Sequence, residues 1–313
     1  MNIVYSSDEN YVQHMAVSIE SLLENNKETD EIVIYVLSND ISRQSQSLLE
    51  ELVFPFNRVI YFIDFAPFKE QLKLNMEWEI SLSSYARLFL PEMLPEDCKK
   101  VLYLDCDTVV CDSLDAFWNT DLQGKTVGAV IDTVSSQFKN AVGLKENDVY
   151  VNAGVLLVDL EKWRLKNVQA KLLKIIESYE GRVSHHDQGT INGVLDDDIV
   201  YLHPKYNAMT PVFTTRYKNL YSLYKIKGKY YSKRELLEAK KSPVIIHYVP
   251  EFVGRVWEYE CQHPKKDLYR EYLSKTAWKD NLKHAKNVES RKMQCIYWIY
   301  CKGPVWLQKI LFR

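Results

Sequence analysis

The sequence has no run of about 18 apolar residues, so it predicts no membrane-spanning helix. Its start has no basic segment followed by a long apolar stretch, so no signal peptide is expected. The net charge of −2 over 313 residues provides no global attraction to nucleic acid. What remains is an ordinary globular composition, 46% hydrophobic and 26% charged, in a chain long enough for one large α/β domain or two small ones.

No two of the six cysteines have the Cys-x-x-Cys spacing, and no Gly-x-Gly-x-x-Gly follows the first apolar run. The first absence favours reduced thiols in a cytosolic protein over a metal or redox site. The second absence removes the dinucleotide-binding fingerprint. His185 and His186 are adjacent, and on a helix their side chains diverge by about 100°, so we expect them to cap or pack rather than to bind zinc.

Two aspartates come directly after a short buried strand. The apolar run 101–104 is typical of a strand covered on both faces, and Asp105 and Asp107 follow it. In an extended chain this spacing places both carboxylates on one side, where they repel each other unless a cation lies between them. Mn²⁺ or Mg²⁺ suits such oxygen ligands, especially where a diphosphate completes the coordination. The alternative is that the two aspartates only cap a turn or the next helix.

Apolar runs that alternate with helical periodicity indicate an α/β protein with a mostly parallel twisted sheet flanked by helices. Strands are predicted at residues 2–6, 31–38, 58–63, 101–104, 126–131, 150–160, 199–202 and 242–248. Helices are predicted at residues 12–26, 43–52, 83–90 and 161–179, with a polar helix start at 184–192. Residues 206–231 show little periodicity and are expected to form a long surface loop.

The loop at residues 6–11 lies between the first predicted strand and the first predicted helix. Ligands of open α/β sheets bind at the carboxyl ends of strands, and helix N-termini attract anions, so this loop suits a nucleotide. The alternative is that Asp8 and Asn10 serve only as helix caps.

Three further residues have two interpretations each. Arg87 is a lone cation in an apolar run, so it either pairs with an acid or faces an anion. His247 ends the last predicted strand and is either a core histidine or a neighbour of Asp105 and Asp107. Gly154 lies within a predicted strand, where glycine often marks the close approach of a ligand or another backbone.

The last 23 residues differ from the rest of the chain. They contain five cations and no acids, and the cations are Arg291, Lys292, Lys302, Lys309 and Arg313. Tryptophan, tyrosine and aliphatic residues lie among them, a composition that suits the interface of a membrane with anionic lipids. The alternative is a C-terminal helix docked on the domain, although Gly303 and Pro304 would break it into two pieces.

Six segments together resemble glycosyltransferase family 8, which includes bacterial lipopolysaccharide α-galactosyltransferases and glycogenin. In order along the chain they are Ile3–Tyr11, Ser84–Leu88, Tyr103–Asp107, Val151–Val155, His186–Gln188 and Ile246–Tyr248. The resemblance covers residues 1–257. It implies a GT-A fold, with a single Rossmann-like nucleotide-sugar domain at 1–280 and a basic-aromatic tail at 281–313. It also implies a UDP-sugar donor, usually UDP-galactose or UDP-glucose, the cofactor Mn²⁺ with Mg²⁺ as the alternative, and transfer with retention of anomeric configuration.

The resemblance assigns roles to individual residues. Asp105, Asp107 and His247 would bind the metal, and Asp187 and Gln188 would be the catalytic residues. The implied donor-binding residues are Ser6, Ser7, Asp8, Asn10, Tyr11, Arg87, Asp105, Cys106, Asn152, Ala153, Asp187, Gln188, Gly254 and Arg255. Because the amide of Gln188 is a poor nucleophile, we expect front-face transfer in which the leaving phosphate accepts the proton of the acceptor.

The chain departs from the family pattern at two places. Many members continue Asp-Gln with a second aspartate near the donor sugar, and here that position is Gly189. Members often place Lys-Pro-Trp after the metal histidine, whereas this chain has Gly254, Arg255, Val256 and Trp257 after a longer segment. Arg255 would take over the grip on phosphate, because a guanidinium also binds phosphate well.

The leading hypothesis is a metal-dependent retaining enzyme that transfers a hexose to a glycan, glycolipid or glycoprotein. One alternative is a nucleotidyltransferase, whose usual glycine-rich basic loop is missing from residues 6–11. Another is a sugar-nucleotide-binding protein that has lost catalysis, which the glycine at 189 would favour. With the basic tail, the expected location is the cytoplasm, on the inner face of the cell membrane.

Overall fold

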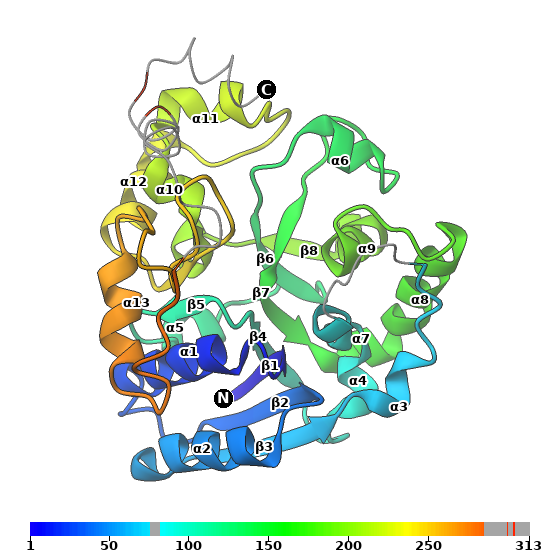
Figure 1. Ribbon diagram of the computed structural model, residues 1–313. Coiled ribbons are helices and arrows are strands. Elements are labelled where there is room, and N and C mark those ends of the chain that lie inside the picture. Colours follow the sequence, from blue (N-terminus) through cyan, green and yellow to red (C-terminus); the bar gives the residue numbers. More distant parts are fainter. Residues whose placement is uncertain (76–81, 285–298, 300–302, 304–313) are drawn as a thin grey trace.

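The computed structural model describes residues 1–75, 82–284, 299 and 303 (Figure 1). Seven strands form one sheet in the order β3-β2-β1-β4-β7-β6-β8. They are β1 (Asn2–Asp8), β2 (Val33–Asn39), β3 (Val59–Asp64), β4 (Lys100–Leu104), β6 (Val127–Ile131), β7 (Val151–Asp159) and β8 (Ile199–Tyr201). β7 is antiparallel to β4 and to β6, and the other pairs are parallel. The predicted mostly parallel sheet is therefore confirmed.

Alternating side chains along the strands divide the core into two layers. On β4, Leu102 and Leu104 pack on one face with the helix that follows β1, while Val101 and Tyr103 pack on the other face. The first face is covered by α1 (Val12–Asn25), α2 (Arg43–Val53) and α13 (Lys266–Leu273). The second is covered by α7 (Leu160–Leu165), α8 (Val168–Ser178) and α9 (His186–Leu195), which lie across the sheet from α1 in Figure 1.

A second, three-stranded sheet has the order β5-β10-β9. Its strands are β5 (Thr108–Val110), β9 (Ala208–Met209) and β10 (Ile245–His247). The expectation that His247 ends a strand of the main sheet is wrong, because β10 pairs with β5 and β9 instead. The small sheet nevertheless brings His247 to the aspartates, because β5 begins directly after Asp107 and His247 is in register with Thr108.

Three predicted segments differ from the structure. Residues 206–231 are not a surface loop but contain η4 (Pro204–Asn207), β9, α10 (Thr210–Thr214) and α11 (Tyr217–Leu223), with Met209 and Phe213 buried. Each element is too short to show a period in the sequence. The helix predicted at 161–179 is broken at Asn167, whose φ of 51° is left-handed. The helix predicted at 83–90 is the 3₁₀ helix η2 (Leu82–Phe89), followed by α4 (Leu90–Met93).

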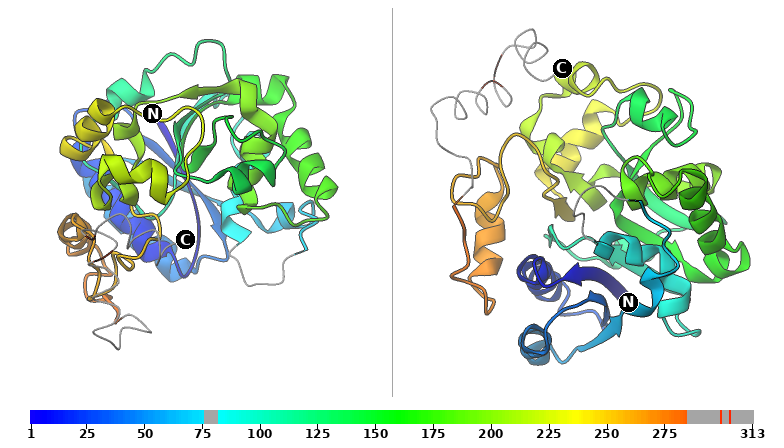
Figure 2. Two further views of the ribbon diagram at one scale, coloured as in Figure 1. Left: turned by 90° about the horizontal axis from the view of Figure 1, so that it is seen from above. Right: turned by 45° about the vertical axis from the view of Figure 1, so that its right-hand side comes forward.

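The remaining helices are short or lie at the edges of the fold (Figure 2). They are η1 (Phe54–Phe56), α3 (Ala66–Lys69), α5 (Asp115–Trp118), α6 (Ser136–Asn140), η3 (Asp196–Asp198) and α12 (Lys233–Lys241). Among the described residues, no helix is both long enough and apolar enough to cross a bilayer. Of the tail predicted at 281–313, only residues 281–284, Ile299 and Gly303 fall within the described part.

Candidate active site

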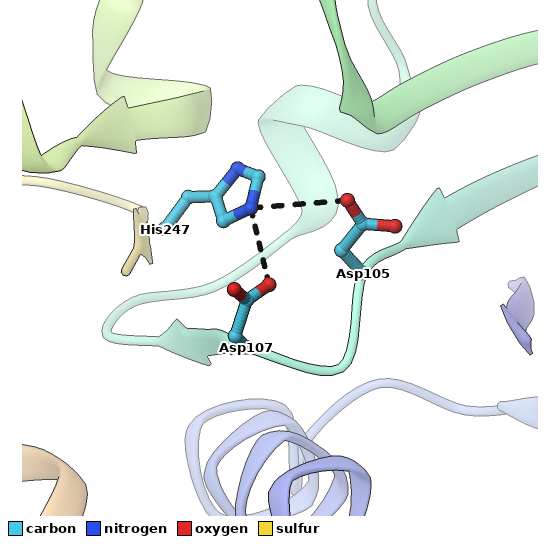
Figure 3. A group of neighbouring side chains, drawn as sticks. All are labelled: Asp105, Asp107 and His247. Atoms are coloured by element: carbon cyan, nitrogen blue, oxygen red, sulfur yellow. Dashed lines mark ion pairs between the residues drawn. The ribbon is translucent and has the colours of Figure 1, made fainter. Parts of the chain in front are cut away.

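The site lies where β4 ends. The turn after Leu104 is held by two hydrogen bonds, from Asp105 N to Gly154 O at 2.7 Å and from the hydroxyl of Thr108 to Asp105 O at 2.8 Å. This turn points both aspartates toward His247 (Figure 3). His247 Nε2 lies 3.2 Å from Asp107 Oδ1 and 3.8 Å from Asp105 Oδ2. One ligand atom from each of the three residues lies within 4.8 Å of the others, as a metal site requires.

Gly154 makes this convergence possible. A Cβ at this position would lie 2.3 Å from His247 Cε1 and 2.5 Å from Asp105 Oδ2. Two side chains of the cluster approach Gly154 closely, whereas a glycine within a strand was expected to mark the approach of a ligand or another backbone. Because β7 runs antiparallel to β4, the first residues of β7 lie at the same sheet edge as the last residues of β4.

Asp107 and His247 affect each other's ionisation. Burial on its own would raise the pKa of Asp107, but the charges of His247 and Arg255 outweigh it and hold that pKa below its usual value. Burial opposes charge on His247, yet Asp107 and Asp105 raise its pKa. The cluster thus has an excess of negative charge that a proton on His247 only partly balances.

Arg87 is buried beside this cluster, with 4% of its surface exposed. Its NH2 lies 2.7 Å from Asp105 Oδ1, its Nε lies 3.0 Å from Asp187 Oδ2, and its NH1 donates to Ala153 O. The guanidinium also lies 4.2 Å from the centre of the Tyr103 ring. Burial opposes the charge of Arg87, but the two carboxylates raise its pKa, so Arg87 is an ion-paired cation. Of its two interpretations, the pairing with acids is what the structure shows.

Asp187 and Gln188 lie in the first turn of α9, and Gln188 belongs to a network of amides. Gln188 Oε1 accepts hydrogen bonds from Ala153 N and Asn152 Nδ2, each at 3.1 Å. Its Nε2 donates to Asp132 Oδ2 at 3.0 Å. Burial raises the pKa of Asp187, and Arg87 opposes this rise. The structure therefore brings Arg87, Asn152, Ala153, Asp187 and Gln188 together, as the sequence predicts.

Two members of this network were not predicted. Asp132 follows the carboxyl end of β6, as Asp105 follows that of β4, so the same pattern would have indicated it. Asn207 is fully buried and lies in the segment predicted to be a surface loop. Its amide contacts both His247 and Asn152.

A cavity of about 830 Å³ opens beside Asp105 and Asp107. The predicted residues that line it are Ser6, Ser7, Asp8, Asn10, Tyr11, Arg87, Asp105, Cys106 and Asp107. The unpredicted ones are Asn39, Asp40, Lys69, Leu82, Ser83, Ser84 and Tyr103, which come mainly from the end of β2 and from η2. The sheet order explains this, because β2 lies next to β1 and its end reaches the same cavity.

The loop before α1 is held from two sides. Asp8 Oδ1 accepts a hydrogen bond from Asn10 N at 3.0 Å, and Tyr11 N donates to Asp8 O at 3.1 Å. The carboxylate of Glu9 accepts from the hydroxyl of Ser45 and from Ser42 N at the start of α2. The residue that caps α1 is Tyr11, without a side-chain hydrogen bond, so the capping interpretation of Asp8 and Asn10 does not describe this helix.

Gly254 and Arg255 lie outside the residues that line this cavity. The guanidinium of Arg255 lies 5.2 Å from the centre of the Trp257 ring, and Trp257 stacks on His14 at 3.8 Å. Gly254 has a left-handed φ of 79°. Because the charge of Arg255 lowers the pKa of Asp107 and opposes the rise in that of Tyr11, Arg255 lies within electrostatic range of both.

Gly189 is required by its surroundings. A Cβ here would lie 1.8 Å from Ser184 O, so no side chain fits, and an aspartate in this position would need another backbone path. His185 and His186, which precede it, have left-handed φ values of 57° and 54°. They pack apart from each other, because His185 stacks on Phe138 and His186 meets the edge of Tyr85.

The family model of glycosyl transferase family 8 matches residues 2–260. This chain belongs to glycosyl transferase family 8. General stress protein A of Bacillus subtilis is 28% identical over 285 residues, which cover 89% of this chain and 94% of that protein. A lipopolysaccharide 1,2-glucosyltransferase of Escherichia coli is 26% identical over 93% of this chain and 83% of its own length.

The solved structure of the galactosyltransferase LgtC with donor and acceptor sugar analogs is also similar. It is 27% identical with a TM-score of 0.71, and the match covers 88% of this chain and 96% of LgtC. The GT-A fold and the family expected from the six sequence segments are therefore confirmed. With the family and these relatives, the protein is a hexosyltransferase.

Proposed function

We propose that this family 8 enzyme transfers galactose or glucose from a UDP-sugar to a glycan, glycolipid or glycoprotein acceptor. We further propose that the reaction depends on Mn²⁺ and retains the anomeric configuration. The observation that carries the proposal is the group of Asp105, Asp107 and His247, whose two aspartates line a cavity large enough for a nucleotide-sugar. The placement of Arg87, Asp187 and Gln188 on the other side of Asp105 adds support.

The residues fit a divalent cation. Two carboxylates and an imidazole nitrogen are donors that Mn²⁺ accepts, and Mg²⁺ is the alternative. Asp105 Oδ2, Asp107 Oδ1 and His247 Nε2 would hold the ion, and the excess negative charge of the cluster favours it. A bound ion supplies charge that stabilises a departing diphosphate.

The nucleotide-sugar would extend from the loop before α1, where the nucleotide would lie, to the start of α9, where the sugar would lie. Asp8, Asn10 and Tyr11 would hold uridine, with Ser6, Ser7 and Cys106 beside it. The hydroxyls of Ser6 and Ser7 already donate to main-chain carbonyls, so these two residues would contribute mainly shape. Arg255, preceded by Gly254, would approach the diphosphate from the segment after β10.

The hexose would contact Arg87, Asn152, Ala153, Asp187 and Gln188. The carboxylates of this region are already engaged, because Asp187 pairs with Arg87 and Asp132 accepts from two amides. Gln188 is an amide with both of its ends hydrogen-bonded, so it suits the role of orienting the sugar rather than of attacking it. These contacts favour front-face transfer. Gln188→Ala should slow transfer without eliminating it, and a covalent glycosyl-enzyme trapped on the wild type would overturn this mechanism.

The test of the whole proposal is UDP release from a panel of UDP-hexoses, with Mn²⁺ or with EDTA, in the presence and absence of glycan acceptors. We expect release that requires the metal and is strongest with one UDP-hexose. Pyrophosphate formation from a sugar phosphate and UTP would indicate a nucleotidyltransferase instead. Tight donor binding with no turnover on any acceptor would indicate a binding protein that has lost catalysis.

We also propose that residues 281–313 attach the domain at 1–280 to the cytoplasmic face of the membrane. The support is the run of five cations without acids, of which each contributes about 1 kcal/mol near an anionic surface. Truncation after Asn287 should abolish sedimentation with anionic liposomes and leave UDP-sugar hydrolysis intact. Full-length protein that fails to sediment at low salt would show that the tail has another role.

A further inference from the structure

One buried side chain joins the two parts of the site. Asn207 has no exposed surface and ends η4, one residue before β9. Its Oδ1 lies 3.1 Å from His247 Nδ1, and its Nδ2 donates to Asn152 Oδ1 at 2.8 Å. His247 belongs to the small sheet and Asn152 to the main sheet, so the amide of Asn207 bridges the two sheets within the site.

The side-chain amides of Asn152, Gln188 and Asn207 can each be oriented without ambiguity. The orientation follows from the main-chain N–H groups of Ala153 and Gly154, because an N–H group can only donate. Gly154 N donates to Asn152 Oδ1 at 3.0 Å, so the Nδ2 of Asn152 must face Gln188 and Asp132. Ala153 N donates to Gln188 Oε1, so the Nε2 of Gln188 must face Asp132, whose carboxylate is an acceptor. Both orientations agree with all of the hydrogen bonds that these side chains make.

The orientation of Asn207 then follows from that of Asn152. Because Asn152 presents its oxygen, Asn207 must present its NH₂ group, and its own oxygen faces His247. An amide oxygen only accepts, so Nδ1 of His247 must carry a proton. Because Nδ1 keeps its proton, Nε2, which faces Asp105 and Asp107, is the nitrogen that can lose its proton and offer a lone pair to a cation.

We propose that Asn207 is a positioning residue that fixes the tautomer of His247 for metal binding and simultaneously orients Asn152 toward the donor sugar. The proposal rests on the metal site in the proposed function. Ligating histidines commonly donate their second ring N–H to an acceptor, and loss of that acceptor lowers metal affinity about 10- to 100-fold. Asn207 does more than accept a hydrogen bond from His247, because its NH₂ group also donates to Asn152, a second residue of the site.

The decisive measurement is Mn²⁺ affinity by electron paramagnetic resonance, without donor, in folded variants. Asn207→Leu should weaken Mn²⁺ binding about 10- to 100-fold. Asn207→Asp retains an acceptor for His247 but cannot donate to Asn152, so it should bind Mn²⁺ at least as well as wild type and still transfer slowly. The matched control is Asn26→Leu, which removes another buried amide with two main-chain hydrogen bonds far from the site and should leave Mn²⁺ affinity unchanged.

The tautomer is also observable directly by ¹⁵N nuclear magnetic resonance of histidine-labelled protein, with the His247 signals assigned from His247→Gln. Wild type should show a proton on Nδ1 of His247 with the downfield shift of a hydrogen bond to Asn207, and Asn207→Leu should lose that shift. Equal Mn²⁺ affinity in wild type and Asn207→Leu, or a wild type in which Nδ1 of His247 carries no proton, would overturn the inference. A wild type that binds no Mn²⁺ would instead overturn the proposed metal site, and the resonance experiment would still decide the tautomer.

Discussion

The two oxygens of Asp105 face two different halves of the site. Oδ1 faces Arg87, a cation that the chain itself provides and that is also paired with Asp187. Oδ2 faces Asp107 and His247, where negative charge gathers and where the ion-pair partner is the titratable His247, with the charge of Arg255 acting from outside the group. The first half is electrostatically complete in the protein alone, whereas the second would be completed by the proposed cation. One half should therefore govern folding stability and the other should govern metal-dependent activity.

The largest effect is expected in the ligand-dependent half. Asp107→Asn keeps the shape of the side chain but removes charge from the metal cluster, so turnover should fall at least about 1,000-fold, or about 4 kcal/mol in the barrier. Asp105→Asn should lose as much activity and also lower the free energy of unfolding, because Arg87 then loses one of its two carboxylates. Activity assays and urea denaturation of both variants measure this difference. Equal stability of the two variants would break the division between the halves.

The next largest effect is on the free energy of unfolding, and it is expected on the Arg87 side of Asp105. Arg87→Met leaves the buried Asp187 and the partly exposed Asp105 without their cation, so the free energy of unfolding should fall by about 3–5 kcal/mol. The matched control is Lys73→Met, which breaks a fully exposed pair with Glu177 and should change stability far less than Arg87→Met does. A loss as small in Arg87→Met as in the control would show that the buried pairs do not stabilise the fold.

The third prediction concerns Gly154, where an added methyl group would lie between Asp105 and His247. Gly154→Ala should move His247 or Asp105 enough to lower Mn²⁺ affinity and turnover about 100-fold, as displacements near 1 Å commonly do. Gly124→Ala is the control, because it has a left-handed φ of 78° but no atom within 4 Å of its Cβ. It should lose some stability and no Mn²⁺ affinity. If both variants bind Mn²⁺ as wild type does, the close approach at Gly154 is not what shapes the cluster.

The site residues that the sequence predicts lie next to a clear strand pattern or within a family motif. Asp105 and Asp107 follow an apolar run, and Asp187 and Gln188 lie in a family motif, so their grouping was predictable. His247 was placed near the aspartates although its sheet was wrong, because a short strand carries no sign of which neighbours it pairs with.

The unpredicted residues share a different property. Asn207 lies in a segment of elements of two to seven residues, which are too short for a hydrophobic period to appear. Asn39 and Asp40 reach the cavity because β2 lies beside β1, and Lys69 reaches it from α3, which follows the next strand β3; that order depends on pairing across the sheet. Contacts that depend on tertiary register rather than on local pattern are not available from one sequence.

The smallest expected effect is on the pH dependence of the free energy of unfolding, and it differs in sign between two histidines whose pKa values Asp107 raises. Burial lowers the pKa of His14 to about 3, whereas Asp107 and Asp105 raise that of His247 against the opposing effect of burial. For His14 the unfolded chain binds its proton first, so stability is complete above pH 6.5 and falls as the pH drops from about 6.5 toward 3. For His247 the sign is opposite, because its contribution is complete below the unfolded pKa and disappears as the pH rises through the folded pKa.

Between pH 8 and pH 5, the protonation of His14 in the unfolded chain should lower the free energy of unfolding by about 2 kcal/mol. His14→Gln should remove that part of the loss, as measured by urea denaturation across this range. Parallel pH curves for wild type and His14→Gln would contradict a buried neutral His14 and would remove the contrast with His247.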